Sequence, residues 1–536
     1  MNAWQPALEV VKSCLKAGVA EFVVCAGARN AALLEALARA EAAGVARVWR
    51  HFEERSAGFF ALGRTLETAQ PCAVVTTSGT AAAELLPAII EAFYQNRPLL
   101  AITADRPAAY RGSGAPQVIE QPGLFGNYAF GGGFAAWDGK QPLHLNIELE
   151  ETFACGDETF SAADSGVFAP PRERVDVAAL ARWLRADAYL GTVVLLGGLE
   201  PDEREDVFHF CQALGAPLLA DATSGLREAL QHLALPDGDR LLQAQPPGRI
   251  LRLGDVPSGR FWRELEDLAH ISVWSVCRNG LPGLARPSNV IRGSLERVLA
   301  ALGEVAPIGD ALDYLPRCSR RAALIDELLE TYPDSEPSLL RTLSQYVSLG
   351  GGLFLGNSLP IREWNLFAQM ERPLASVRAN RGANGIDGQI STWLGWSADL
   401  TESWALVGDL TALYDLAAPF VLGQIECRGR VLAVINNGGG KIFERLPCLS
   451  TMSPRAVEWM TNPQTADFAG FATLWGMSHL RIRTPDDFDH LGDPGLPAVL
   501  LELVPDPSQT RAFWAAWDVH GAGTRLAPAP GPSPIL

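Results

Sequence analysis

The sequence predicts an α/β protein made of three consecutive doubly wound parallel-sheet domains. Short β-rich runs alternate with amphipathic helical runs from one end of the chain to the other, which is the pattern of parallel sheets. The chain of 536 residues is also too long for one hydrophobic core, because a single core rarely grows beyond about 250 residues. Several domains of this class are therefore expected.

The first block of elements covers residues 1–176. We expect its strands at 21–27, 46–52, 71–79 and 98–103, with helices at 31–44 and 80–95 between them. A proline-bearing segment at 165–176 closes the block, because proline cannot continue a helix or a central strand.

The second and third blocks cover residues 177–318 and 319–520. The second has expected strands at 191–198, 216–221, 248–254, 270–276 and 288–293. A charged helical connector at 319–335 opens the third block, whose strands we expect at 351–357, 403–409, 430–437, 479–483 and 497–504. Residues 521–536 are rich in proline and predict a flexible tail.

Composition restricts the ligands and the compartment. A net charge of -17 and a pI near 5.0 argue against a nucleic-acid or anionic-membrane binder, which would present a basic face. The nine cysteines are scattered without a C-x-x-C pair, which favours a reducing cytoplasm over disulfides or a zinc site. The chain start lacks the pattern of a signal peptide, and no stretch reaches membrane-spanning length. We expect a cytoplasmic protein.

Two polar strand ends predict a metal and diphosphate site. Asp409 ends one expected strand and Asn437 the next, and a crossover places such strands side by side. Asp409, Asn437 and the carbonyl of Gly439 are oxygen ligands that Mg²⁺ accepts, and a diphosphate would supply more. A helix opening at Thr411 after Gly408 offers amide groups to phosphates. Two unrelated turns are the alternative interpretation.

A carboxylate follows another strand of the first block. Glu54 lies between an apolar strand and an apolar helix, where loss of hydration raises the pKa of its carboxyl group. Such a group suits proton exchange with a ring nitrogen. It could equally be a helix-start glutamate that interacts with the helix dipole, and Glu53 competes for either role.

These motifs together resemble the thiamine-diphosphate enzyme superfamily. The superfamily's diphosphate signature is usually G-D-G, followed later by N-N and a glycine. This chain has a similar pattern, in which Leu410 replaces the third residue of G-D-G. The pair Glu54-Arg55 matches the superfamily's Glu-Arg, which implies that Glu54 activates the cofactor's pyrimidine. Ser78, Gly79 and Thr80 match its pyrimidine-side loop.

The resemblance implies domain roles and an assembly. Residues 1–176 would be the pyrimidine-binding domain, 177–318 the central domain and 319–520 the domain that binds the diphosphate with Mg²⁺ or Mn²⁺. It also implies a homodimer or homotetramer whose active sites lie between subunits.

The whole chain resembles the 2-succinyl-5-enolpyruvyl-6-hydroxy-3-cyclohexene-1-carboxylate (SEPHCHC) synthase family of menaquinone biosynthesis. The stretches that carry the resemblance include "CAGARN", "HFEERSAG", "FLGNSLPIRE", "NRGANGIDGQISTWLG" and "NNGGGKIFERLP". The resemblance implies decarboxylation of 2-oxoglutarate and addition of the succinyl carbanion to isochorismate. Both substrates are dicarboxylates, for which guanidinium groups are suited as bidentate partners.

The resemblance also assigns individual residues. Those expected to bind substrate are Arg29, Arg106, Gln117, Arg260, Ser358, Arg362, Arg381 and Phe443. Those expected to bind the cofactor, beyond the pyrimidine-side loop, are Asn357, Ser358, Ile386, Gly408, Leu410, Thr411 and Ile442. Ile386 matches the apolar wedge that bends the cofactor, and Ile442 with Phe443 would wall the cavity.

Three departures from the family pattern concern the acceptor side. Ala28 replaces a serine before Arg29, Pro116 an asparagine before Gln117, and Phe261 a basic residue after Arg260. A related thiamine-diphosphate carboligase or decarboxylase with another 2-oxoacid or acceptor is therefore the first alternative. A non-catalytic subunit of the same fold is the second, which the joint retention of cofactor residues disfavours.

Overall fold

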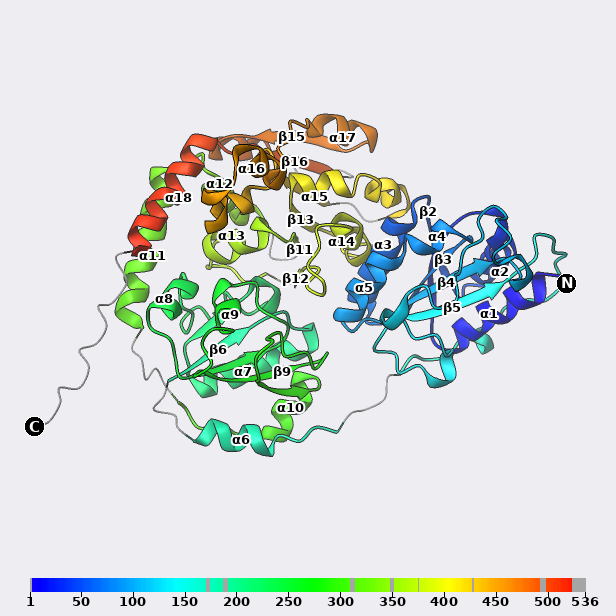
Figure 1. Ribbon diagram of the computed structural model, residues 1–536, viewed down its shortest axis with the longest axis horizontal. Helices are drawn as coiled ribbons and strands as arrows, with labels where there is room; N and C mark the ends of the chain where they lie inside the picture. Colours follow the sequence, from blue (N-terminus) through cyan, green and yellow to red (C-terminus); the bar gives the residue numbers. More distant parts are fainter. Residues whose placement is uncertain are drawn as a thin grey trace, which may run out of the picture.

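The protein is described by a computed structural model that covers residues 2–169, 174–186, 191–308, 314–347, 351–374, 376–426, 429–491 and 498–522. Three separate parallel sheets with interleaved helices follow one another along the chain (Figure 1), which confirms the predicted fold class. Each sheet lies inside one of the three predicted residue ranges.

The first sheet has the strand order β2-β1-β3-β4-β5. Its strands are β1 Glu21–Cys25, β2 Arg47–His51, β3 Cys72–Thr76, β4 Leu99–Asp105 and β5 Leu143–Glu148. Its helices are α1 Trp4–Lys16, α2 Ala31–Ala42, α3 Glu54–Thr68, α4 Thr80–Ala83 and α5 Leu86–Tyr94. The strand β5 was not predicted. The helix predicted at 80–95 is two helices, because Pro87 lacks an amide hydrogen and fits only in a first turn.

The second sheet has the strand order β10-β9-β8-β6-β7. Its strands are β6 Thr192–Leu196, β7 Leu218–Ala220, β8 Arg249–Leu253, β9 Ser272–Cys277 and β10 Asn289–Arg292. Its helices are α6 Ala178–Arg185, α7 Arg204–Leu214, α8 Gly238–Ala244, α9 Arg260–Glu264 and α10 Leu295–Leu302. All five strands expected in this block are present.

The third sheet has the strand order β12-β11-β13-β14-β16-β15. Its strands are β11 Gly352–Leu355, β12 Ser376–Arg378, β13 Ser403–Gly408, β14 Arg430–Ile435, β15 Ser478–Ile482 and β16 Val499–Leu503. Its helices are α11 Leu315–Thr331, α12 Glu336–Tyr346, α13 Leu359–Phe367, α14 Gln389–Trp396, α15 Asp409–Tyr414, α16 Pro454–Thr461, α17 Phe468–Leu474 and α18 Pro507–Ala522. The short edge strand β12 was not predicted. Helix α18 runs two residues into the predicted tail, and the rest of that tail lies outside the described residues.

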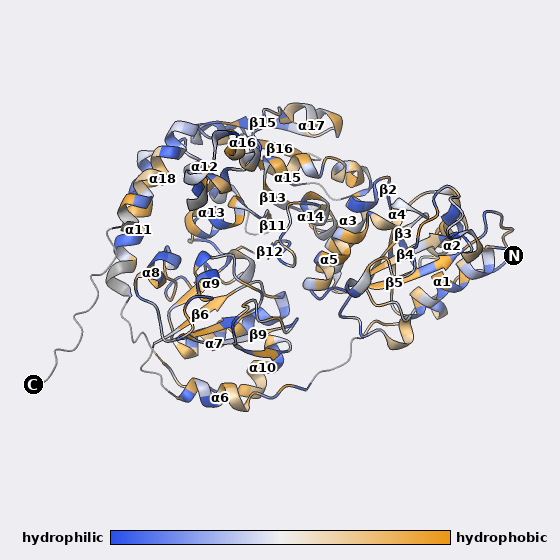
Figure 2. Ribbon diagram, in the orientation of Figure 1, coloured by the Kyte–Doolittle hydropathy of each residue, from blue (hydrophilic) through white to orange (hydrophobic). Residues whose placement is uncertain are grey.

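The central strands are mostly apolar and fully buried because helices cover both faces of each sheet. Every residue of β3, β4, β8 and β16 is buried. Figure 2 shows hydrophobic residues along the strands around β6 and hydrophilic residues on the outer helices. None of the helices in the described part of the chain is long and apolar enough to cross a membrane.

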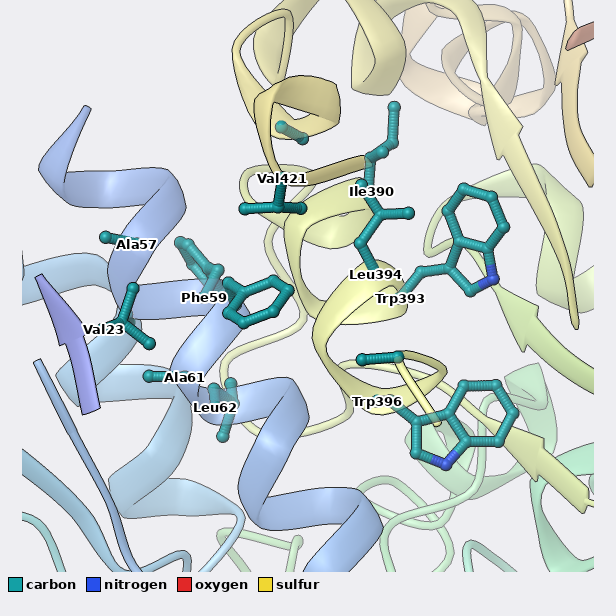
Figure 3. Close-up of a cluster of buried hydrophobic side chains, with 14 of the residues drawn as sticks. Val23, Ala57, Phe59, Ala61, Leu62, Ile390, Trp393, Leu394, Trp396 and Val421 are labelled. Atoms are coloured by element: carbon teal, nitrogen blue, oxygen red, sulfur yellow. The ribbon is translucent and has the colours of Figure 1, made fainter. Parts of the chain in front are cut away.

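The first and third domains pack together through helices α3 and α14 (Figure 3). Phe59 and Leu62 of α3 belong to the same buried cluster as Ile390 and Leu394 of α14. At the crossing, a methyl group on Gly63 would collide with the backbone of α14. Gly395 of α14 likewise faces the backbone of Phe60 in α3. Because neither glycine carries a side chain at these contacts, the two helices can approach closely.

An ion-pair network borders the same contact. The Arg64 guanidinium, 1% exposed, lies 2.6 Å from the Glu21 carboxylate in its own domain and 2.7 Å from Asp399 in the third domain. It also donates a hydrogen bond of 3.1 Å to the carbonyl of Gly395. Because this cation is buried and fully paired, it joins the two domains.

Candidate active site

The ends of strands β13 and β14 form the candidate diphosphate loop. Gly408 at the end of β13 pairs with Ile435 at the end of β14, so the residues that follow lie side by side. The Oδ2 atom of Asp409 accepts hydrogen bonds from the backbone amides of Gly438 at 2.9 Å and Gly439 at 2.8 Å. The structure thus brings Asp409 next to the predicted glycine loop. Helix α15 begins at Asp409 itself, two residues before the predicted start at Thr411.

The glycines of this loop are required by the backbone. Gly438 has φ 85° and Gly439 has φ 126°, conformations that other residues rarely adopt. A Cβ on Gly439 would also lie 2.8 Å from the carbonyl oxygens of Thr461 and Asn462. The amide of Gly440 donates to the Thr461 carbonyl at 2.6 Å, which ties the loop to the end of α16.

The side chain of Asn437 is oriented for a cation. Its Nδ2 donates to both carboxylate oxygens of Glu336, at 3.2 and 3.0 Å, which fixes the direction of the amide. Its Oδ1 is buried and has no hydrogen-bond partner among the described residues. Buried polar atoms normally have a partner, so this open acceptor fits a divalent metal ion held together with Asp409.

Two buried carboxyl groups lie behind Asn437. Glu336 at the start of α12 is 4% exposed and Glu363 in α13 is 1% exposed. Burial raises the pKa of the Glu336 carboxyl group. Burial and, next, the charge of Glu336 raise the pKa of Glu363 well above its usual range. The pair therefore retains a proton more readily than exposed glutamates do, while Glu336 still accepts from Asn437.

Gln464 is a site residue that the sequence did not reveal. Its Nε2 donates to the Oδ2 of Asp409 at 2.6 Å and to the Oδ1 of Asn436 at 2.8 Å. Asn436 in turn donates to the buried carboxylate of Glu502 at 2.7 Å. Asn436 therefore supports the loop, whereas Asn437 faces the candidate metal position.

A second strand end gathers the candidate substrate arginines. The Nδ2 of Asn357, just past β11, donates to the carbonyls of Asn380 at 2.7 Å and Gly385 at 2.8 Å. Its Oδ1 accepts from the Arg381 guanidinium at 2.9 Å. Arg362 in α13 donates to the carbonyl of Ser358, whose φ of 76° is unusual for a residue other than glycine.

Arg362 and Arg381 lie close enough to influence each other. Burial and then the charge of Arg381 lower the pKa of Arg362, and burial likewise lowers the pKa of Arg381. Within the part of the chain that the structure describes, neither guanidinium is in a salt bridge with a carboxylate. Arg362 is exposed and Arg381 is half-buried. Two cations without a described ion-pair partner at one strand end are suited to an anionic ligand.

In the first domain, Arg29 and Arg106 share one carboxylate. The Arg29 guanidinium lies 2.6 Å from Glu151, whose side chain is 57% exposed, and donates to the Leu149 carbonyl at 3.0 Å. Arg106 lies 3.5 Å from the same Glu151 oxygen. The two predicted arginines therefore converge, with Glu151 placed where a ligand carboxylate could compete.

The structure separates the roles of Glu53 and Glu54. The Glu53 carboxylate caps helix α3, accepting from the amides of Arg55 at 3.1 Å and Ser56 at 2.9 Å. Among the described residues, no other residue donates a hydrogen bond to the half-buried Glu54 carboxyl. Burial, followed by repulsion from Glu53 and Glu84, raises the pKa of Glu54. Glu54 is thus the carboxyl available to a ligand.

The pyrimidine-side loop contains a turn that requires glycine. Gly79 has φ 83° and donates its amide to Gln121 at 2.8 Å. Ser78 is buried, and Thr80 opens α4. A Cβ on Gly79 would lie 3.1 Å from the Cα of Gln117, so the predicted Gln117 does adjoin this loop.

Among the described residues, no hydrogen bond joins Glu54 to Asp409. The start of α3 contacts the far end of α15, where Arg55 donates to the Tyr414 carbonyl at 2.7 Å and Ser56 to Asp415 at 3.3 Å. Asp409 begins the opposite end of α15, roughly 9 Å away at 1.5 Å per helical residue. Glu54 and Asp409 thus lie near opposite ends of the same short helix.

Comparison with known proteins decides the family. Residues 7–124 match the family model of the N-terminal TPP (thiamine pyrophosphate) binding domain of thiamine pyrophosphate enzymes. The SEPHCHC synthase of Akkermansia muciniphila is 49% identical over 518 residues, covering 94% of this chain and 96% of that protein. The synthase of Bdellovibrio bacteriovorus is 37% identical over 541 residues, covering 97% and 99%.

The chain belongs to the SEPHCHC synthase family. It is thus a thiamine-diphosphate-dependent enzyme of α/β fold, and the predicted family and cofactor are confirmed. A divalent metal is typical of such enzymes, and the open Asn437 oxygen fits one.

The departures from the family pattern have different weight in the structure. Phe261 is fully buried in the core of the central domain, so it does not face a ligand. The preceding Arg260 has a side chain that is 68% exposed and pairs with Glu264 at 2.8 Å, and its backbone amide donates to Asp239 at 2.7 Å. Ala28 and Pro116 are exposed beside Arg29 and Gln117 and stay relevant to the acceptor.

The remaining predicted residues lie along the same loops. Gly408 and Leu410 flank Asp409, and Thr411 is buried behind them. Ile386 follows the loop of Arg381, and Ile442 with Phe443 lies in the turn after the glycines.

Proposed function

We propose that the chain catalyses the thiamine-diphosphate-dependent decarboxylation of 2-oxoglutarate and the addition of the succinyl group to isochorismate, giving SEPHCHC for menaquinone biosynthesis. The observation that carries the proposal is the pair of guanidinium groups of Arg362, which is exposed, and Arg381, which is half-buried, both outside any described salt bridge. Arg362 follows strand β11 and Arg381 follows β12, and β11 is the neighbour of the strand β13 that leads into the candidate metal loop. The relatives that bear this name over nearly the whole chain support it.

Asp409, Asn437 and the Gly439 carbonyl would hold Mg²⁺ or Mn²⁺ and, through it, the cofactor diphosphate. When bound, thiamine diphosphate would supply a nucleophilic carbon for the oxoacid and a cationic thiazolium ring that takes up the electron pair released by decarboxylation. Gln464 fixes the Asp409 carboxylate and Glu336 fixes the Asn437 amide, so both oxygens are oriented before the metal arrives.

Glu54 would exchange a proton with the pyrimidine ring. Burial raises the pKa of its carboxyl group, which favours the protonated form more than in an exposed glutamate, and this carboxyl is not used by the helix cap. Ser78 and Gly79 on the neighbouring loop would contact the ring edge.

The arginines would bind the substrate carboxylates. A dicarboxylate requires a cation at each end, and Arg362 with Arg381 can serve one end in a bidentate way. Arg29 and Arg106 can serve the other end if the ligand displaces Glu151, whose exposed side chain makes this exchange inexpensive.

We infer that the active enzyme is a homodimer or a dimer of dimers. In the superfamily to which the chain belongs, the pyrimidine-binding domain of one subunit faces the diphosphate-binding domain of another, so a second copy would complete each site. Large apolar side chains exposed near Glu54 and α15 support such a contact, with Phe52 58%, Tyr414 51%, Leu416 45% and Phe420 38% exposed.

The cytoplasm is the compartment we propose for the enzyme. The described cysteines are free thiols, and most are buried, which is compatible with a reducing environment.

The direct test incubates purified protein with thiamine diphosphate, Mg²⁺ and 2-oxoglutarate, with and without isochorismate, and identifies the products by mass spectrometry. SEPHCHC should form only with both substrates. Product from a different 2-oxoacid or acceptor, with none from this pair, would favour a sister carboligase. Absence of any cofactor-dependent turnover would favour a non-catalytic subunit.

A further inference from the structure

Helix α5 of the first domain contacts the loop that carries Arg381 in the third domain (Figure 1). Glu91 on α5 is 3% exposed. Its Oε1 accepts from the backbone amide of Gly382 at 2.7 Å, and its Oε2 accepts from the amide of Ala383 at 2.6 Å. One carboxylate therefore holds two successive amides of a loop in another domain.

Those two amides depend on Glu91. In the part of the chain that the structure describes, neither amide has another acceptor. The side chain of Gln95 donates to the Glu91 Oε1 at 2.6 Å and thereby fixes the rotamer of the carboxylate. Both Glu91 carboxylate oxygens thus accept hydrogen bonds from the loop. These bonds restrict the movement of the loop backbone.

The same loop is held from its other side by Asn357. Asn357 donates to the carbonyls of Asn380 and Gly385 and accepts from the Arg381 guanidinium. The backbone around Arg381 is therefore clamped between Asn357 in its own domain and Glu91 in the first domain. A shift of the loop would move the guanidinium that we assign to a substrate carboxylate.

A second domain-bridging carboxylate shows what is particular to Glu91. Asp399 also joins the first and third domains, but it pairs with the side chains of Arg64 and Arg47 at the edge of the contact, with 43% of its side chain exposed. It makes no described hydrogen bond to the Arg381 loop. Asp399 therefore serves as a matched control for domain association.

We propose that Glu91 is a positioning residue that sets the Arg381 loop for the substrate carboxylate. The proposal rests on the proposed function, since it takes Arg381 as a substrate ligand. In the proposed dimer, a first domain offers Glu54 to the partner's cofactor and Glu91 to its own chain's substrate loop. Each first domain thus contributes to two active sites.

The test compares Glu91→Gln with Asp399→Asn. In Glu91→Gln one loop amide faces an NH₂ group and loses its acceptor. We expect the KM for 2-oxoglutarate to rise about tenfold, as for a lost hydrogen bond to a charged group. The affinity for thiamine diphosphate and Mg²⁺, measured by calorimetry, should stay within about twofold. Hydrogen exchange in a peptide covering 380–386 should accelerate without any substrate.

The control and the second variant keep the inference falsifiable. Asp399→Asn should lower thermal stability but leave both the KM and the exchange of 380–386 unchanged. If Glu91→Gln does not fold, Gly382→Ala tests the same contact, because its Cβ would lie 2.5 Å from the Glu91 carbonyl and 3.0 Å from its Oε1. Wild-type values for both KM and exchange in a folded variant would overturn the proposal.

Two different measurements distinguish failure of the proposed function from failure of the Glu91 proposal. Failure of the proposed function would appear as wild-type protein that does not use 2-oxoglutarate, whereas the exchange measurement reports on the Glu91 contact without turnover. Faster exchange with no effect on the KM would overturn the positioning role and leave only a structural contact.

Discussion

Glu53 and Glu54 are adjacent acids with different tasks, and their substitution tests the site at its most specific point. Glu54→Gln removes the exchangeable proton but keeps the size of the side chain. Turnover should fall by about 10²- to 10⁴-fold, the usual contribution of a positioned acid or base. The fold should be intact, because the structure uses Glu53 and not Glu54 to cap α3.

Glu53→Ala should instead weaken the start of α3 and leave turnover nearly unchanged. It removes the acceptor for the amides of Arg55 and Ser56, and loss of a helix cap costs about 1 kcal/mol. That corresponds to roughly fivefold faster exchange of those amides if the first turn opens locally. Turnover should change by less than about threefold, because removing the Glu53 charge alters only one of the influences on the Glu54 pKa.

The assay pairs steady-state kinetics with hydrogen exchange of the peptide that starts α3. The division of roles is refuted if Glu53→Ala loses as much turnover as Glu54→Gln. It is equally refuted if Glu54→Gln accelerates exchange at 55–56 as strongly as Glu53→Ala does.

Four further predictions follow from the structure. Asp409→Ala should weaken Mg²⁺ and thiamine diphosphate together in a calorimetric titration, because the metal loses its carboxylate; unchanged affinity would remove Asp409 from the metal site. Arg381→Ala or Arg362→Ala should raise the KM for one substrate about ten- to a hundredfold, with cofactor binding hardly changed and lysine rescuing only partly. If both keep wild-type constants for both substrates, the arginines do not bind them. Gly63→Ala should lower the thermal midpoint through about 1 to 3 kcal/mol of overpacking against α14, whereas an unchanged midpoint would mean that the helices can separate. Burial lowers the pKa of His144 to about 4 from 6.5, so this side chain alone should cost up to about 3 kcal/mol of stability as pH falls from 6.5 to 4, in addition to the similar share of His51; His144→Gln should reduce, but not abolish, the loss in melting experiments at pH 5 and 7.

Most strands could be predicted because their apolar runs are complete. The exceptions lie at sheet edges. In β5 the side chains of His144 and Asn146 are polar and are satisfied by Thr103 of β4, a partner far away in the sequence. The strand β12 has three residues, too few for a periodic signal.

The site was predictable where a motif follows a strand end. Asp409 and Asn437 meet because neighbouring parallel strands end at one edge. Glu336, Gln464 and Glu91 were not predictable, because each arrives from a distant segment and a single polar residue carries no pattern. The choice between Glu53 and Glu54 needed the geometry of the helix cap.

The left-handed glycine loop has a practical consequence for anyone who wishes to redirect this enzyme to new acceptors. Both positions 438 and 439 have positive φ angles, and at 439 a side chain would also collide with backbone carbonyls. Most substitutions at these two positions should therefore disturb the loop. Mutant libraries are better spent at Ala28 and Pro116, which are exposed beside candidate substrate residues and carry no such backbone restriction.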